Sequence, residues 1–115
     1  MIQKITLITR IFEGCSNIEY AEDILDDLMS LDGSVLKEAC ARIKKINDNP
    51  FCGEELQNKY GMNLSGCRKE YFNGTRMRIV WEPYFEPNEH GYVAIIWSIG
   101  PRKNEDVYRR AYKRR

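Results

Sequence analysis

The sequence predicts an α+β fold in which a helical hairpin and a C-terminal helix pack on a small, mostly antiparallel sheet. Between Asn17 and Asn49, apolar residues recur at steps of three and four, a spacing typical of amphipathic helices. From Leu64 to Ile99 the period changes to that of strands, and a strong hairpin signal lies at Asn73-Gly74. The expected order is β-α-α-β-β-β-α, in a single domain that spans residues 1–115.

The N-terminal half is expected to form one strand and two helices. Lys4–Phe12 is rich in β-branched residues that partly alternate with polar ones, which predicts a first strand. Ile18–Met29 carries the apolar stripe of a helix, and Asp32-Gly33 is expected to end it because glycine readily takes the left-handed cap conformation. Ser34 is the expected N-cap of a second helix, which Asn49-Pro50 stops.

The C-terminal half is expected to form three strands and a last helix. Two strands flank Asn73-Gly74, because both residues accept the positive φ of a type I′ turn. Pro83 and Pro87 are expected to end the second of these strands. Tyr92–Ile99 is apolar on both faces, as a central strand covered on each side would be. Asn104 is the expected N-cap of the final short helix.

Composition argues against membrane, metal and disulfide chemistry. No apolar run approaches the roughly 20 residues of a membrane span, and the N-terminus lacks a signal peptide's long apolar middle, so we expect a cytoplasmic protein. The cysteines form no C-x-x-C pair and the single histidine, His90, is far from them in sequence, so we expect free thiols, no metal site and no cofactor. We expect His90 to be a solvated turn residue.

The charge is distributed unevenly along a chain whose net charge is only +1. Residues 1–60 hold 7 Lys or Arg against 11 Asp or Glu, whereas residues 61–115 hold 11 against 6. The cations are especially dense in Ser98–Arg115, where two tyrosines lie among them. This asymmetry indicates a polyanionic partner for the C-terminal half. A basic last helical turn also complements the helix dipole, so part of this charge has an ordinary structural explanation.

Two motifs in the C-terminal half are specific enough to suggest a family. One is the strand Arg78-Ile79-Val80-Trp81. The other is Gly-x-Arg followed by Val-Tyr and a basic helix, formed by Gly100, Arg102, Val107, Tyr108, Ala111 and Arg114. Together they resemble the RelE/ParE superfamily of toxins from bacterial toxin–antitoxin pairs, and the RelE branch more closely. The expected order of elements is compatible with that family over the rest of the chain.

The resemblance implies a function and partners. RelE-like members are ribonucleases that cut messenger RNA in the ribosomal A site, ParE-like members inhibit DNA gyrase, and both are silenced by a cognate antitoxin. We therefore expect a ribosome-dependent mRNA endonuclease with mRNA, the ribosome and an antitoxin as partners. In the ribonuclease branch, functional residues occupy the positions that match Lys69, Arg78, Arg102 and Tyr108. The alternatives are a non-enzymatic gyrase inhibitor and a degenerate RNA-binding member without cleavage.

The chemistry of RNA cleavage fits these residue types. Attack of a 2′-OH on the adjacent phosphate needs a base, positive groups that stabilise the phosphorane, and an acid for the leaving 5′-oxygen. Arg78 and Arg102 suit the second role, since a planar guanidinium binds two phosphate oxygens at once. Tyr108 is a candidate base, because nearby arginines favour its phenolate, or a platform for a splayed nucleobase. Lys69 would donate a proton or stabilise charge. Further expected RNA contacts are Arg68, Arg76, Lys103 and Arg109.

Other residues near these motifs have simpler interpretations. Met77, Ile79 and Trp81 alternate with the arginines and are expected to form the core face of their strand. Tyr71 and Tyr112 are expected to be packing residues. Glu70-Tyr71-Phe72 make the strand after Lys69 less basic than is usual in the family, which keeps the degenerate alternative open. Gln57–Asn63 is expected to be an additional loop. The antitoxin is expected to cover the sheet and to shield or displace the C-terminal helix.

Overall fold

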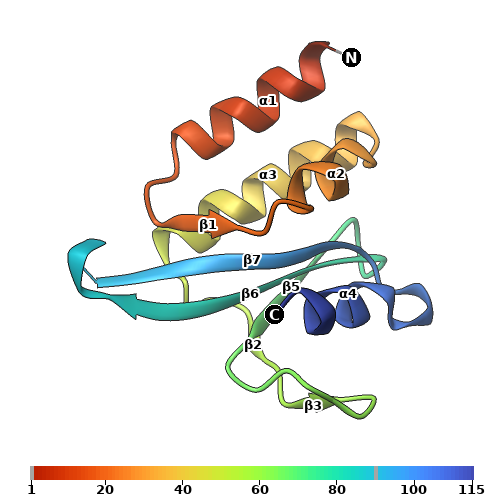
Figure 1. Ribbon diagram of the computed structural model, residues 1–115. Coiled ribbons are helices and arrows are strands. Elements are labelled where there is room, and N and C mark those ends of the chain that lie inside the picture. Colours follow the sequence, from red (N-terminus) through yellow and green to blue (C-terminus); the bar gives the residue numbers. More distant parts are fainter. Residues whose placement is uncertain (1, 90) are drawn as a thin grey trace.

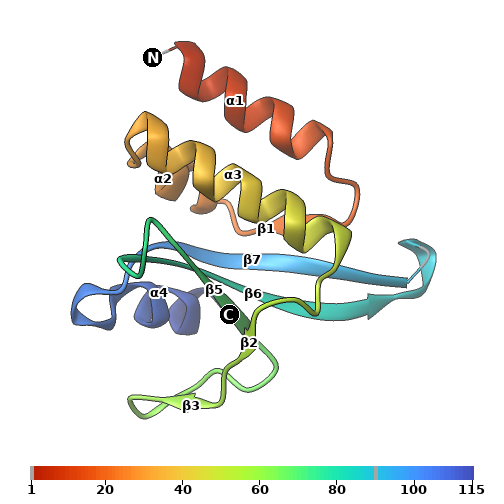
Figure 2. The same cartoon turned by 180° about the vertical axis from the view of Figure 1, so that it is seen from behind.

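A five-stranded sheet with helices on both faces forms the centre of the computed structural model, which describes residues 2–89 and 91–115. Three helices cover one face and a single C-terminal helix lies against the other (Figure 1; Figure 2 shows the same arrangement from behind). The predicted α+β class, with a mostly antiparallel sheet and a C-terminal helix, is confirmed. The helices are α1 (Ile2–Glu13), α2 (Ile24–Met29), α3 (Gly33–Asp48) and α4 (Asp106–Arg114).

The strand order is β1-β7-β6-β5-β2, and every pair in this sheet except β1 with β7 is antiparallel. A separate two-stranded hairpin of β3 and β4 lies on the α4 side, below the sheet in Figure 1. The strands are β1 (Ile18–Tyr20), β2 (Glu54–Glu55), β3 (Asn58–Lys59), β4 (Met62–Asn63), β5 (Arg68–Phe72), β6 (Met77–Glu86) and β7 (Gly91–Pro101). Two short 3-10 turns, η1 (Pro87–Glu89) and η2 (Lys103–Glu105), follow β6 and β7.

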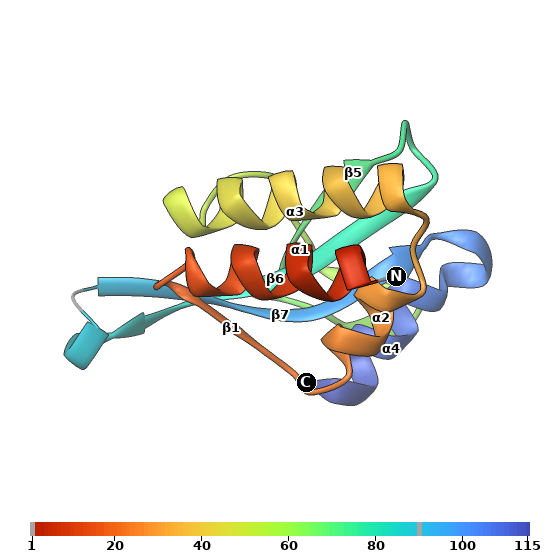
Figure 3. The ribbon, with the colours of Figure 1, turned by 90° about the horizontal axis from the view of Figure 1, so that it is seen from above.

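The predicted first strand, Lys4–Phe12, is wrong, because this segment lies within helix α1. Ile8 is buried, and Leu7, Ile11 and Phe12 pack against the core from the same helix. Helix α1 packs on α3, as the view from above shows (Figure 3). Burial against a neighbouring helix therefore overrides the strand preference of the β-branched residues, since intrinsic propensity is a weak prior beside tertiary packing.

The predicted first helix is correct only in its second half. Ile18–Tyr20 forms strand β1, which pairs in parallel with Ala94–Ile96 of β7, and the helix begins at Ile24. The helix also ends at Met29, before the expected stop at Asp32-Gly33.

The second predicted helix is confirmed as α3, although Asp32 rather than Ser34 occupies the N-cap position. Gln57–Asn63, expected as an additional loop, contains the short strands β3 and β4, and the short strand β2 lies just before it.

The predicted hairpin between β5 and β6 is confirmed, but not its two-residue type I′ turn. Phe72 pairs with Met77, so the connection has four residues, 73–76. Asn73 and Gly74 have φ values of 53° and 68°, the left-handed conformation that this dipeptide favours. Pro87 follows the end of β6 as expected, whereas Pro83 lies inside the strand, opposite Ala94. β7 is the central strand that the sequence predicts, between β1 and β6.

The last helix begins one residue later than predicted, at Asp106. Asn104 does not cap it, because Asn104 lies in η2 with a positive φ, and Glu105 precedes the first helical residue. His90, which we expected in a turn, lies outside the described residues. None of the helices within residues 2–89 and 91–115 is long and apolar enough to cross a membrane.

Two hydrophobic cores lie on the two faces of the sheet. The larger one joins the sheet to α1, α2 and α3 and includes Ile79, Trp81 and part of Met77, as the alternation along β6 predicts. The smaller one lies between the sheet and α4 and is formed by Leu56, Leu64, Cys67, Val80, Val107, Tyr108 and Ala111. All four cysteines are free thiols, and burial raises the pKa of Cys40 and of Cys67 to about 11.

Candidate functional site

A pocket of about 380 Å³ opens beside the N-terminal end of α4 and is strongly cationic. Four of its lining residues are the ones that the sequence predicts to act on RNA: Lys69, Arg78, Arg102 and Tyr108. They come from β5, from β6, from the segment after β7 and from α4. The other lining residues are Lys59, Tyr60, Tyr71, Lys103, Asn104 and Glu105. The tertiary structure thus brings all four predicted catalytic residues to one cavity.

Arg78 is the most constrained cation of the pocket. It is only 4% exposed, and its Nε donates to the hydroxyl of Tyr108 at 3.3 Å. Its Nη1 donates to the carbonyl oxygens of Thr75 and Met77, and its guanidinium carbon lies 3.6 Å from the centroid of the Tyr71 ring. These contacts compensate for the burial of a charge and fix the guanidinium plane. The Nη2 atom has no hydrogen-bond partner among the described residues, so it remains available to an anion.

Lys69 and Tyr71 form a polar pair on the same face of β5. The Nζ of Lys69 donates to the hydroxyl of Tyr71 at 2.7 Å and lies 3.8 Å from a carboxylate oxygen of Glu54. The hydrogen bond from Lys69, aided by the charges of Lys69 and Arg78, lowers the pKa of Tyr71 despite partial burial. Burial lowers the pKa of Lys69, but its hydrogen bond to Tyr71 and the nearby tyrosines and Glu54 outweigh this and raise it.

Tyr71, expected to be a packing residue, lines the pocket. This position could have been predicted from the alternation of strand side chains, which puts Lys69 and Tyr71 on one face. A phenol held by an ammonium group and stacked on a guanidinium can exist as the phenolate more readily than a free tyrosine. Tyr71 is therefore a second candidate for proton transfer, beside Tyr108.

Arg102 and Lys103 supply exposed positive charge at the pocket. Both are exposed, and the side chain of neither makes a hydrogen bond or an ion pair with the described residues. The backbone holds Arg102 in place, because its N–H donates to the carbonyl oxygen of Arg76 at 3.1 Å. Just before it, Gly100 pairs with Arg78 across the β6–β7 ladder. Register therefore places Arg102 near Arg78 while leaving its guanidinium free for a ligand.

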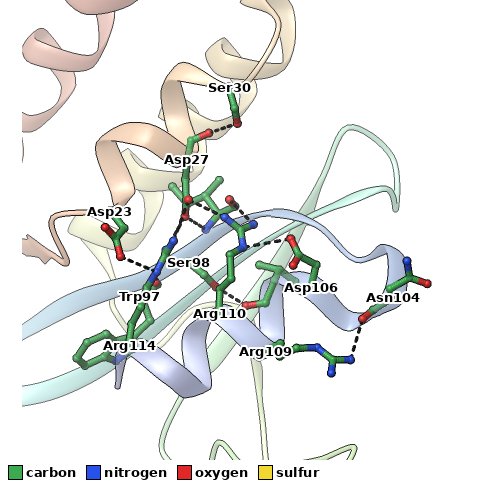
Figure 4. Close-up of polar contacts among 12 residues, drawn as sticks. Asp23, Asp27, Ser30, Trp97, Ser98, Asn104, Asp106, Arg109, Arg110 and Arg114 are labelled. Atoms are coloured by element: carbon green, nitrogen blue, oxygen red, sulfur yellow. Dashed lines mark hydrogen bonds and ion pairs between the residues drawn. The ribbon is translucent and has the colours of Figure 1, made fainter.

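The remaining predicted RNA contacts, apart from Lys103, do not line this pocket. Arg68 donates to the carbonyl oxygens of Cys52 and Gly53 and pairs with Glu55. Arg109 is exposed and donates to the carbonyl oxygen of Asn104 (Figure 4). Arg76 is exposed in the turn before β6, not on the strand face of Arg78 as expected. RNA contacts by these three side chains stay predictions.

Two lining residues were missed because they reach the pocket only through tertiary packing. Lys59 and Tyr60 belong to the β3–β4 hairpin, a segment expected to be an additional loop. The Nζ of Lys59 lies 5.4 Å from the ring centroid of Tyr108 and 5.5 Å from that of Tyr60. The rings of Tyr60 and Tyr108 are 6.5 Å apart. Nothing in the local sequence indicates where such a short hairpin docks.

Most cations of α4 point away from the pocket. Figure 4 shows Arg110 and Arg114 converging on the buried carboxylate of Asp27 in α2. Arg115 forms an ion pair with Glu82 and donates to the carbonyl oxygens of Asn63 and Ser65. Two arginines of the basic half, Arg110 and Arg114, thus pair with Asp27 of the acidic half, so part of the positive charge of the C-terminal half is neutralised within the fold. The cation-rich C-terminal segment therefore contains arginines that pair within the fold, such as Arg110 and Arg114. It also contains Arg102 and Lys103, which line the pocket.

Comparison with solved structures identifies the fold. A mutant of the Escherichia coli toxin RelE, with two arginines replaced and in the free state, superposes with a TM-score of 0.59 at 21% identity, covering 84% of this chain and 94% of that one. The chain therefore has a RelE-like fold. The RelE mutant bound to a peptide of the antitoxin RelB gives a TM-score of 0.56 at 18% identity, covering 85% of this chain and 95% of that one.

The intact E. coli RelBE toxin–antitoxin complex is a further match to this RelE-like chain. It gives a TM-score of 0.54 at 18% identity, covering 73% of this chain and 93% of the matched chain. No protein-family model matches the sequence, and no curated protein is significantly similar to it. The resemblance stated from the sequence motifs is thus confirmed at the level of the fold.

Proposed function

We propose that this chain is the toxin of a toxin–antitoxin pair and that it cleaves messenger RNA, in a ribosome-dependent manner, by attack of a 2′-OH on the adjacent phosphate. One observation carries the proposal. Lys69, Arg78, Arg102 and Tyr108, chosen from the sequence, line the same pocket, together with Tyr71. The RelE-like fold supports it, because RelE is the toxin of the RelBE pair.

In this proposal the phosphodiester binds between Arg78 and Arg102. Arg78 is oriented by its contacts with Tyr71 and Tyr108, and Arg102 has no competing partner among the described residues. Two guanidinium groups on one phosphate stabilise the extra negative charge of the phosphorane more than that of the ground state. Lys69 adds positive charge beside them.

Proton transfer is assigned to the two tyrosines that contact Arg78. Tyr71, whose pKa is lowered by Lys69, accepts the proton of the 2′-OH as the O2′–P bond forms. The P–O5′ bond then breaks, and the hydroxyl of Tyr108 gives its proton to the leaving oxygen. The products are a 2′,3′-cyclic phosphate and a 5′-hydroxyl. The Arg78 guanidinium lies over the ring of Tyr71, and its Nε donates to the hydroxyl of Tyr108, so both phenols lie beside the proposed phosphate site.

A cognate antitoxin is proposed as the protein partner. RelE has been solved both within the RelBE complex and with a RelB peptide. For this chain, we propose that the antitoxin covers the pocket face of the sheet and shields or displaces α4. A stable complex that cleaves RNA at full rate with the Arg78–Arg102 pocket open would contradict this.

Induced expression of three variants tests the proposed activity. Wild-type protein and the control Lys113→Ala, which changes an exposed cation of α4, should arrest growth and produce cleavage sites in translated messages by primer extension. Arg102→Ala and Tyr108→Phe should lose about a hundredfold or more in cleavage rate. Equal growth arrest by all four proteins would overturn the proposal. Inhibition of gyrase supercoiling without RNA cleavage would favour the ParE-like alternative.

A further inference from the structure

The β3–β4 hairpin carries an exposed aromatic residue at a strained position. Lys59 pairs with Met62, so Tyr60 and Gly61 form the two-residue turn, with φ values of 52° and 79°. Such turns favour asparagine and glycine, and a bulky residue with positive φ is an uncommon and costly choice. The ring of Tyr60 gains little burial in return, because the residue is 61% exposed. Strain of this kind often marks a functional position.

The hairpin is held firmly, so its tip has a defined place. Met62 packs on the core between the sheet and α4, next to the fully buried Leu64. Arg115 donates to the carbonyl oxygens of Asn63 and Ser65, which tie the end of the hairpin to the C-terminus of α4. The strand end of the hairpin is therefore held in place, whereas the ring of Tyr60 at the turn is exposed. The tip residues Lys59 and Tyr60 line the same pocket as Arg78 and Arg102.

We propose that this hairpin binds single-stranded RNA beside the cleavage site, with the Tyr60 ring stacking on a nucleobase and Lys59 contacting a backbone phosphate. The inference rests on the proposed function and adds the substrate-binding element to it. Exposed aromatic rings beside cations are the usual surface for unpaired bases, because every base has a π face. Tyr60 meets this description: its ring lies 6.5 Å from that of Tyr108, and the ammonium of Lys59 is near both.

The test uses a substitution that relieves strain and removes the ring at once. Glycine accepts the positive φ at residue 60, so Tyr60→Gly should raise the melting temperature or leave it unchanged. Single-turnover cleavage of ribosome-bound messages is then measured over a range of protein concentrations. We expect the half-saturating concentration to rise about fivefold to a hundredfold, with the maximal rate changed less than about threefold. Tyr60→Phe, which keeps the ring, should retain wild-type values.

Tyr92→Ala is the matched control, since Tyr92 is also an exposed aromatic residue, 51% accessible, but lies near the start of β7 and does not line the pocket. It should cleave as the wild type does. If the wild type cleaves RNA and Tyr60→Gly has the same half-saturating concentration, this inference is overturned while the proposed function stands. A wild type that cleaves neither free nor ribosome-bound RNA would overturn the proposed function and this inference with it.

Discussion

The Oδ1 atom of Asp27 lies 2.6 Å from Nη1 of Arg110, and this ion pair joins α2 and α4, which lie on opposite faces of the sheet. Arg114 binds the other oxygen of the same carboxylate at 2.7 Å. The three side chains also make hydrogen bonds to backbone groups of β7 that lie beyond the end of β1. Asp27 accepts from the N–H of Ile99, Arg110 donates to the Ile99 carbonyl and Arg114 to that of Trp97 (Figure 4). The cluster therefore covers a free sheet edge, which would otherwise invite pairing with another strand.

Removing Asp27 should destabilise the fold strongly. The Asp27→Ala variant leaves two partly buried arginines and the Ile99 N–H without their partner, which costs about 3 kcal/mol in the free energy of unfolding. Urea denaturation measures it. Asp26→Ala is the control, because Asp26 is exposed on the same helix, and it should cost less than about 0.5 kcal/mol. If the two variants unfold at the same urea concentration, the cluster does not hold α4 in place.

Gly100 is required so that Arg110 can reach Asp27. A Cβ at residue 100 would overlap the guanidinium of Arg110, and the φ of Gly100 is not in the left-handed region, so the constraint is steric. We expect Gly100→Ala to destabilise the protein by about 1–3 kcal/mol, the value of hydrogen bonds to a charged group. In an Arg110→Ala background the same change should be nearly neutral. A double-mutant cycle by urea denaturation measures this coupling, and simple additivity would contradict the explanation.

The proposed base predicts a pH dependence of cleavage. Because the pKa of Tyr71 is lowered, the rate should rise with pH and level off below pH 10, the ordinary pKa of tyrosine. Lys69→Met removes the hydrogen bond and charge that lower this pKa, so the rising limb should move to higher pH. Tyr71→Phe keeps the ring that stacks on Arg78 but should lose about 10²–10⁴ in rate. A Tyr71→Phe variant with wild-type rate would leave Tyr108 as the candidate base.

The Glu82–Arg115 pair predicts acid-dependent stability. The hydrogen bond from Arg115 lowers the pKa of Glu82 against an opposing effect of burial, and Trp97 adds a second hydrogen bond. A lowered pKa in the folded state means that this stabilisation is complete above the usual value of 4.5 and is lost as the pH falls through the folded value. Glu82→Gln should cost about 1 kcal/mol at pH 7 and almost nothing at pH 2.

Chemical denaturation at both pH values measures the difference. Glu86→Gln, on the same strand, is the control and should cost less than about 0.5 kcal/mol at pH 7. A cost for Glu82→Gln that stays constant between pH 7 and pH 2 would mean that the ion pair does not contribute.

Elements that local signals specify could be predicted from the sequence, whereas elements that depend on contacts with distant residues could not. The β5–β6 hairpin and α3 were predicted because local signals specify them: Asn73-Gly74 adopts the turn conformation by itself, and α3 has one long apolar stripe. Lys4–Phe12 was misassigned because its composition favours a strand, whereas packing on α3 decides for a helix. The strand β1 was missed because only parallel pairing with β7 makes those three residues extended.

The sequence by itself determined the fold class and, through the family resemblance of its motifs, four residues that meet in one pocket, because such local patterns depend on neighbouring residues. Only the tertiary structure decided the partner of each cation. Arg110 and Arg114 bind Asp27, more than 80 positions away, while Arg102 and Lys103 remain without a partner among the described residues. It likewise brought Tyr71 and Tyr60 to the pocket. The physical reason is that a charge is paired or left free according to which distant side chains share its surroundings, and the order of residues along the chain does not contain those distances.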